Sequence, residues 1–269
     1  MPFYTPAANT KLNKTLIVVC NPFLTLLNIL KSILSLSYPL PTSLNSLPTF
    51  SSLHFLFIHW ERLILLSSFP PSVEEDDDDD EGISTPFELY GRDDVDLLVL
   101  QQRSPTLKSR KQEFVDALLK FCKESGVSSI IFLSGVDLSN RTDAQMMTPI
   151  YYIQPHNTPA FPIRDLMIPK YSSPVPQRPQ NEKDEPDIPF IPGGGLTRRT
   201  LASLPREWTI PTLALLQFVV EGDNRADAHM LAIVAAKVAG IESKIGEWKQ
   251  PSSWNQGLFG TPHDQTLYG

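Results

Sequence analysis

Short runs of apolar residues alternate with one strongly amphipathic segment in the middle of the chain. VDLLVLQQR (95–103) and SSIIFLSG (128–135) have the length and apolar character of strands that are buried on both faces of a sheet. Between them, apolar residues gather on one side of a predicted helix that Gly126 ends as a C-terminal cap; these residues are Phe114, Val115, Leu118, Leu119 and Cys122. The order strand, helix, strand predicts a βαβ unit in a sheet that is at least partly parallel.

A further strand and helix are predicted in the second half of the chain. TLALLQFVV (212–220) is a third apolar run, and the turn EGDN follows it. Asp223 or Asn224 is expected to cap a helix over 225–239. The side of this helix that we expect to face the core carries Ala226, Met230, Ile233, Val234 and Val238. IYYI (150–153) is a candidate strand, and LTRRTLASL (196–204) suits a short helix.

Proline and charge divide the chain into three parts. Residues 1–81 are predicted to be an irregular apolar segment that ends in an acidic linker, EEDDDDDE. Residues 82–260 are predicted to form an α/β domain, and residues 261–269 a flexible tail. Within the domain, residues 155–192 hold ten of the 25 prolines and are expected to form an extended excursion without regular elements.

Charge and cysteine usage exclude several classes of function. The net charge of −7 comes largely from the acidic linker, and the rest of the chain is close to neutral, so no basic footprint for nucleic acid exists. Cys20 and Cys122 are too far apart and too few for a disulfide framework or a zinc site, which predicts a reducing compartment and no metal or cofactor. Prolines interrupt the apolar N-terminal stretch, and Glu61 and Arg62 lie in its last apolar run, so no membrane span is predicted.

The segment FIPGGGLTRRT (190–200) is the strongest candidate for ligand chemistry. Glycines ahead of a helix can expose amides to an anion, with Arg198 and Arg199 in support. However, the spacing matches neither a Walker loop nor a dinucleotide fingerprint, which favours a tight backbone turn.

Two other segments carry candidate catalytic groups. Glu221 and Asp223 could act as paired carboxylates, although a strand-to-helix turn is the commoner use of EGDN. Ser134 could be a nucleophile, but it lacks the Gly-x-Ser-x-Gly context, so a turn that ends its strand is the favoured interpretation.

The chain ends in QTLYG. Leu267 and Tyr268 offer apolar area, and the carboxylate of Gly269 can pair with a cation, so a tail of this form suits insertion into a pocket on another protein. The pattern is short, and its meaning depends on the domain that carries it.

Five blocks, taken together and in order, resemble the family of proteasome assembly chaperone 2, the PAC2 family. They are GISTPFELY, LLVLQQRSP, IPGGGLTRR, LALLQFVVEGDN with ADA after it, and PSSW…LFG, and they extend over residues 82–260. Two of the blocks contain the family's signature loops, which here are Gly193, Gly194, Gly195, Glu221, Gly222, Asp223 and Asn224. Each block alone is unspecific, and their joint occurrence carries the resemblance.

The resemblance implies a three-layer α/β/α domain that is phosphorylase-like in shape but not an enzyme. It implies a heterodimer with proteasome assembly chaperone 1 that promotes assembly of the 20S proteasome α ring, in the cytoplasm and nucleus. Leu267, Tyr268 and Gly269 match a hydrophobic–tyrosine–any-residue tail that docks between α subunits, with the carboxylate meeting a lysine. The alternatives are a phosphorylase-like enzyme acting on a nucleoside or phosphorylated metabolite, and a membrane-tethered adaptor.

The N-terminal region departs from the family pattern of a strand, a Val-Gly-Asn-type turn and an amphipathic helix. TLIVVC (15–20) fits the strand, but residues 21–70 contain neither the turn nor a recognisable helix. These residues are rich in Leu, Ser, Phe and Pro, which pyrimidine-rich codons encode. Two explanations stay open: the segment includes translated intron, or it is a genuine divergent insertion.

Overall fold

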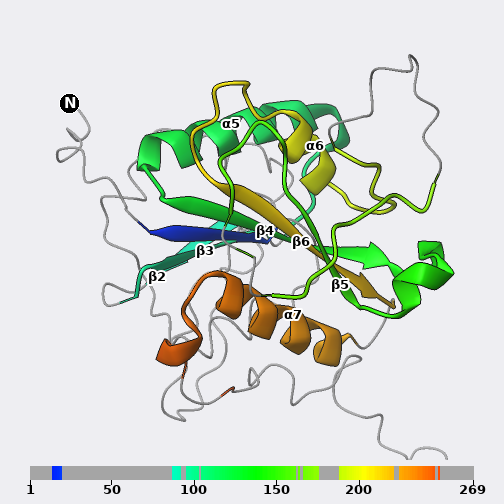
Figure 1. Ribbon diagram of the computed structural model, residues 1–269. Coiled ribbons are helices and arrows are strands. Elements are labelled where there is room, and N and C mark those ends of the chain that lie inside the picture. Colours follow the sequence, from blue (N-terminus) through cyan, green and yellow to red (C-terminus); the bar gives the residue numbers. More distant parts are fainter. Residues whose placement is uncertain are drawn as a thin grey trace, which may run out of the picture.

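A mixed sheet of six strands forms the centre of the protein in the computed structural model, which describes residues 14–19, 87–91, 95–102, 104–161, 163, 166–175, 188–220, 224–245 and 248 (Figure 1). The strand order is β2-β3-β1-β4-β6-β5. The strands are β1 (Thr15–Val19), β2 (Phe87–Gly91), β3 (Leu97–Gln102), β4 (Ser129–Asp137), β5 (Ile150–Ile153) and β6 (Thr212–Val219). The four inner strands, β3, β1, β4 and β6, are parallel, and β2 and β5 join the two sides of this group antiparallel.

In the described parts of the chain, three α-helices and four short 3-10 turns accompany the sheet. The helices are α5 (Lys111–Ser125), α6 (Thr197–Ala202) and α7 (Arg225–Val238), and the turns are η2 (Lys108–Arg110), η3 (Leu138–Asn140), η4 (Asp143–Met146) and η5 (Glu242–Lys244). Figure 1 shows α5 and α6 on one face of the sheet and α7 on the other. No helix among these described residues is long and apolar enough to cross a membrane.

The predicted βαβ unit is confirmed. β3, α5 and β4 follow one another, and Gly126 adopts the left-handed conformation, with φ of 64°, that ends α5. The connection passes over β1, which lies between β3 and β4 and pairs in parallel with both. The apolar run in residues 15–19 is therefore one of the two inner strands of the parallel group, beside β4.

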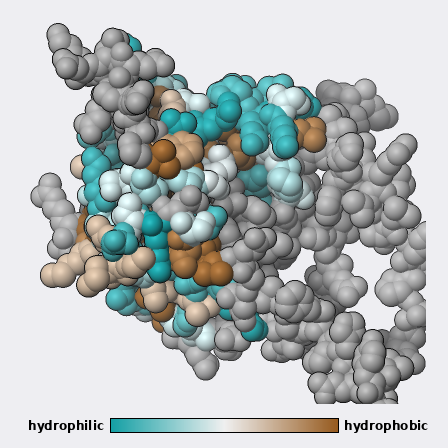
Figure 2. All heavy atoms as spheres, turned by 90° about the vertical axis from the view of Figure 1, so that its right-hand side faces the viewer, coloured by the Kyte–Doolittle hydropathy of each residue, from teal (hydrophilic) through white to brown (hydrophobic). Residues whose placement is uncertain are grey.

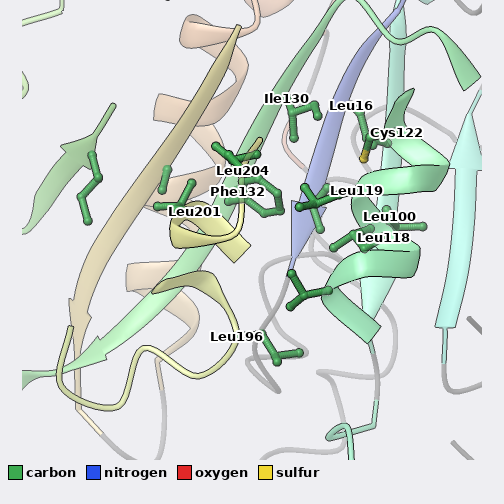
Figure 3. Close-up of a cluster of buried hydrophobic side chains, with 14 of the residues drawn as sticks. Leu16, Leu100, Leu118, Leu119, Cys122, Ile130, Phe132, Leu196, Leu201 and Leu204 are labelled. Carbon is green, nitrogen blue, oxygen red and sulfur yellow. The ribbon is translucent and has the colours of Figure 1, made fainter. Parts of the chain in front are cut away.

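Strand side chains alternate between two cores because successive residues of a strand point to opposite faces. The core beneath α5 and α6 takes Leu16, Val18, Leu98, Leu100, Ile130, Phe132, Ala214 and Leu216 from the sheet. In Figure 3, Leu118, Leu119 and Cys122 of α5 lie over these strands, as Leu201 of α6 does. The core beneath α7 takes Ile17, Val19, Leu97, Val99, Ile131, Leu133, Leu213 and Leu215.

The predicted core face of α7 is wrong. The buried residues of this helix are Ala228, Leu231, Ala232, Ala235, Ala236 and Val238. Ala226 and Met230 are exposed, Ile233 and Val234 are half-buried, and of the predicted face Val238 alone is buried. The helix is apolar on two sides, and the side with small alanine residues packs against the sheet because short side chains let the helix approach it closely.

The proline-rich segment covers the outer edge of β5. Tyr152 donates its backbone N–H to the carbonyl of Pro169 at 3.1 Å, and Tyr171 donates its own to the carbonyl of Tyr152 at 2.8 Å, which forms a parallel bridge between Tyr152 and Lys170. The described residues between 155 and 192 contain no helix or strand, as predicted for that part. Residues 21–70, the acidic linker and the tail 261–269 lie outside the described residues.

The packing of α7 generates a test of its orientation. Ala235 is fully buried against the sheet, so Ala235→Leu should overpack the core and lower the free energy of unfolding by about 1–3 kcal/mol. Ala226→Leu, on the opposite side of the same helix, should change it by less than about 0.5 kcal/mol. Urea unfolding of both variants measures the difference, and equal effects would contradict this orientation.

Candidate functional site

The predicted site residues fall into three groups: the glycine loop, the turn after β6 and the C-terminal tail. The structure describes the whole of the first group and one residue of the second. Gly193, Gly194 and Gly195 are described, as is Asn224. Glu221, Gly222 and Asp223 lie outside the described residues, as do Leu267, Tyr268 and Gly269.

The glycine loop is a tight turn in which each glycine has a steric reason. Gly193 and Gly195 have φ of 66° and 54°, in the left-handed region that side chains disfavour. Gly194 has no such φ, but a Cβ there would lie 2.4 Å from Cγ2 of Ile191, whose side chain is buried. The three glycines therefore serve backbone conformation and close approach.

Two amides and one arginine of the loop form hydrogen bonds within the protein. The N–H of Gly194 donates to the carbonyl of Ile191, and the N–H of Thr197 donates to the carbonyl of Gly194, both at 3.1 Å. Arg199 donates from Nη1 to Oε1 of Gln112 on α5 at 3.2 Å, which links α6 to α5. The guanidinium of Arg198 lies 5.7 Å from the ring centre of Phe190. With two of its amides and Arg199 bonded internally, and with α6 only six residues long, the loop has few donors arranged for an anion.

The turn between β6 and α7 brings together two polar residues that the sequence did not connect. Gln217 on β6 is 1% exposed, and its Nε2 donates to Oδ1 of Asp227 in the first turn of α7 at a long 3.4 Å. Burial raises the pKa of Asp227, against a smaller lowering by this hydrogen bond. Asn224 occupies the N-cap position but its side chain makes no capping hydrogen bond, so that part of the capping prediction is wrong.

The remaining catalytic candidate, Ser134, lies inside a strand. β4 continues past it to Asp137, so the predicted strand-ending turn at Ser134 is wrong. The side chain is buried, and its Oγ donates to the carbonyl of Gly135 at 3.4 Å. An inaccessible hydroxyl that bonds to the main chain is a poor nucleophile. Among the described residues, no group of three His, Cys, Asp or Glu side chains is placed to hold a metal ion.

Exposed apolar side chains lie at the edge of the sheet where the parallel strands end. Met146 and Met147, just before β5, are 56% and 85% exposed, and Val220, just after β6, is 56% exposed. Hydrogen bonds between Thr142 and Gln145 cap the turn η4 that carries Met146. Figure 2, which views the side on which β1, β4 and β6 end in Figure 1, shows apolar residues among hydrophilic ones. Exposed apolar side chains of this kind can take part in contacts with another protein.

The chain is similar in sequence to a known family over most of its described elements. The PAC2 family model matches residues 63–203, which is more than half of the chain and includes β2, β3, α5, β4, β5 and α6. Among curated relatives, proteasome assembly chaperone 2 of Xenopus laevis is 33% identical over 192 residues, which cover 66% of this chain and 70% of the relative. The Homo sapiens protein of the same name is 31% identical over 191 residues, covering 67% and 72%.

Solved structures with a partly similar fold have lower identities. PbaA of Pyrococcus furiosus, described as an archaeal homolog of proteasome-assembly chaperone, has a TM-score of 0.49 at 13% identity, covering 85% of this chain and 82% of that one. A Thermoplasma acidophilum protein with unknown function has a TM-score of 0.48 at 13% identity, covering 87% and 78%.

The steric role of Gly194 predicts a loss of stability on substitution. Gly194→Ala should lower the free energy of unfolding by about 1–3 kcal/mol, because its Cβ would displace the buried Ile191. Gly193→Asn is the matched control: Asn tolerates the left-handed region and nothing lies near its Cβ, so the loss should stay below about 1 kcal/mol. A rise of Tm with added phosphate, lost in Arg198→Ala, would instead restore the anion-binding interpretation.

The raised pKa of Asp227 predicts a pH dependence of stability. A carboxyl whose pKa is higher in the folded state than in the unfolded one stabilises the fold at low pH, and this contribution is lost as pH rises through the folded pKa. Asp227→Asn removes the titrating carboxyl, so the stability of the variant relative to the natural chain should rise as the pH increases from about pH 3 through the raised pKa of Asp227. Urea midpoints across that range measure it, and a difference that is constant with pH would contradict the burial of this carboxyl.

Proposed function

The chain belongs to the PAC2 family, and from this membership we propose that it is a proteasome assembly chaperone. The observation that supports the proposal is the similarity to proteasome assembly chaperone 2 of several animals, at about 30% identity over about two-thirds of the chain. The exposed Met146, Met147 and Val220 agree with a role in protein contacts.

In the finer form of this proposal, the chain forms a heterodimer with proteasome assembly chaperone 1 and promotes assembly of the 20S proteasome α ring. The tail Leu267, Tyr268 and Gly269 supplies the contact with the ring. Leu267 and Tyr268 would fill an apolar pocket between α subunits, while the carboxylate of Gly269 pairs with a lysine there. The signature loops 193–195 and 221–224 would act as turns that shape the domain or its partner interface.

We further propose that the chain is not an enzyme and needs no cofactor. The amides of Gly194 and Thr197 and the guanidinium of Arg199 form hydrogen bonds within the protein, and Ser134 is buried. The sheet with helices on both faces is compatible with a three-layer, phosphorylase-like domain. Cys122 is a buried free thiol, in keeping with a protein of the cytoplasm and nucleus.

We propose that the chain is divided into three parts with different roles. Residues 1–81 form an N-terminal segment with an acidic linker, residues 82–260 form the chaperone domain with its excursion over 155–192, and residues 261–269 form the docking tail. β1 contributes to the domain's sheet from within the N-terminal segment.

The function is tested by affinity capture from cell extract with a tag at the N-terminus. The intact chain should recover proteasome assembly chaperone 1 and α subunits, whereas a chain without Leu267–Gly269 should keep the chaperone and lose most α subunits. One added glycine after Gly269 is a sharper variant, because it keeps both side chains and moves only the carboxylate.

The controls distinguish a loss of docking by the tail from a loss of folding of the domain. Asp264→Asn, within the tail but outside the last three residues, should leave recovery unchanged. Equal melting curves of all variants show that the domain is intact. If a folded, intact chain recovers no proteasome component, the proposed function fails; if the truncated chain recovers as many α subunits as the intact one, the role of the tail alone fails.

A further inference from the structure

Four cations from two neighbouring helices and the segments beside them form what we call the basic face: Lys108, Lys111, Arg199 and Arg206. Gln112 on α5 joins the two helices, because its side chain accepts from Nη1 of Arg199 and donates to Oγ of Ser203, both at 3.2 Å. Lys108 lies about one helical turn before Gln112, and Arg206 follows Ser203 by three residues. Figure 2 shows hydrophilic residues gathered at the top of its view, where α5 and α6 lie in Figure 1.

The cations of the basic face lack the carboxylate partners that cations near α7 have. There, Lys237 pairs with Glu242 at 3.5 Å and Lys244 pairs with Asp96 at 3.8 Å. Among the residues that the structure describes, no carboxylate forms an ion pair with any of the four cations. Three of the four are exposed, and Lys111 is half-buried. Their positive charge is therefore available to a partner.

Helix stability does not explain the two lysines at the start of α5. The N-terminal end of a helix carries a partial positive charge, so cations there are unfavourable. Neither η2 nor α5 has a side-chain cap that would offset this charge. Arg110 is compensated by Glu113, whose carboxylate lies 2.7 Å from its guanidinium, but Lys108 and Lys111 have no such partner. A role in binding accounts for cations that the helix itself disfavours.

The carboxylates on the same surface favour a protein partner over nucleic acid. Glu113 and Asp116 are exposed on α5, and Asp116 accepts a hydrogen bond from Nε2 of Gln112 at 2.9 Å. A continuous row of phosphates on this surface would meet both carboxylates and be repelled by them. Separate carboxylates of a protein segment can lie opposite the cations alone, and the planar guanidinium of Arg206 can pair with one through two hydrogen bonds.

We propose that the basic face binds an acidic segment of another protein, whose Asp or Glu side chains pair with Lys108, Lys111, Arg199 and Arg206. Charge pairs at an exposed surface speed association and fix the orientation of the partner, and salt weakens them. This contact is separate from docking by the C-terminal tail and does not depend on the proposed function.

Fluorescence polarisation of a labelled octaglutamate peptide with the full-length chain tests the proposal at about 0.15 M salt. The double variant Lys108→Gln/Lys111→Gln should raise the Kd of the peptide by about fivefold or more. The matched control is Lys120→Gln/Lys123→Gln, which removes the same charge from the other end of α5, about 18 Å away, and should change the Kd by less than about twofold. The Tm of the first variant should equal or exceed that of the natural chain, because cations leave a helix N-terminus. Weaker binding is then distinct from loss of folding.

Four results would overturn the proposal. The first is no binding of octaglutamate by the natural chain, and the second is an equal loss in both double variants, which would reflect net charge alone. The third is tighter binding of an eight-nucleotide uridine RNA that the same lysine pair controls, which would assign the face to nucleic acid. The fourth is binding that appears only when serines replace the acidic run 74–81, which would assign the face to the chain's own acidic residues. None of these results depends on proteasome binding, so failure here is distinct from failure of the proposed function.

Discussion

The structure depends on burying β1 on both of its faces. This strand pairs with β3 on one edge and β4 on the other, so its backbone groups are satisfied by parallel neighbours. Leu16 and Val18 point to one core, and Ile17 and Val19 to the other, all almost fully buried. A strand of this kind is stable only if both faces of the sheet are covered. The placement of α5 with α6 on one side and α7 on the other follows from that requirement.

β1 also lies far from its neighbours in sequence. It occupies residues 15–19, ahead of the region 63–203 that matches the family, yet it pairs residue by residue with 97–101. The entropy cost of closing a loop rises only by about 0.6 kcal/mol for each doubling of its length. A long stretch between β1 and β2 is therefore compatible with this sheet, whether it is a genuine insertion or translated intron.

Local sequence patterns predicted where the helices and strands lie in the chain better than they predicted which side of a helix packs against the sheet. The runs in β3, β4 and β6 and the cap at Gly126 were correct, because each depends on neighbours in sequence. The core side of α7 was predicted incorrectly, because a helix that is apolar on two sides has no single direction for periodicity to indicate. At the candidate site, spacing alone excluded the known phosphate loops. The contact of Gln217 with Asp227 was missed, because which side chains meet across two elements is decided by tertiary packing.

The segment that is hydrogen-bonded to Tyr152 affects how readily this edge of the sheet can pair with another polypeptide. β5 is the last strand on its side of the sheet, and an uncovered last strand offers its free amides and carbonyls to any extended polypeptide nearby. The bonds to Pro169 and Tyr171 occupy those groups in the middle of β5. With these groups of Tyr152 already bonded, the middle of β5 is a poorer template for pairing with another extended polypeptide than a bare edge strand would be.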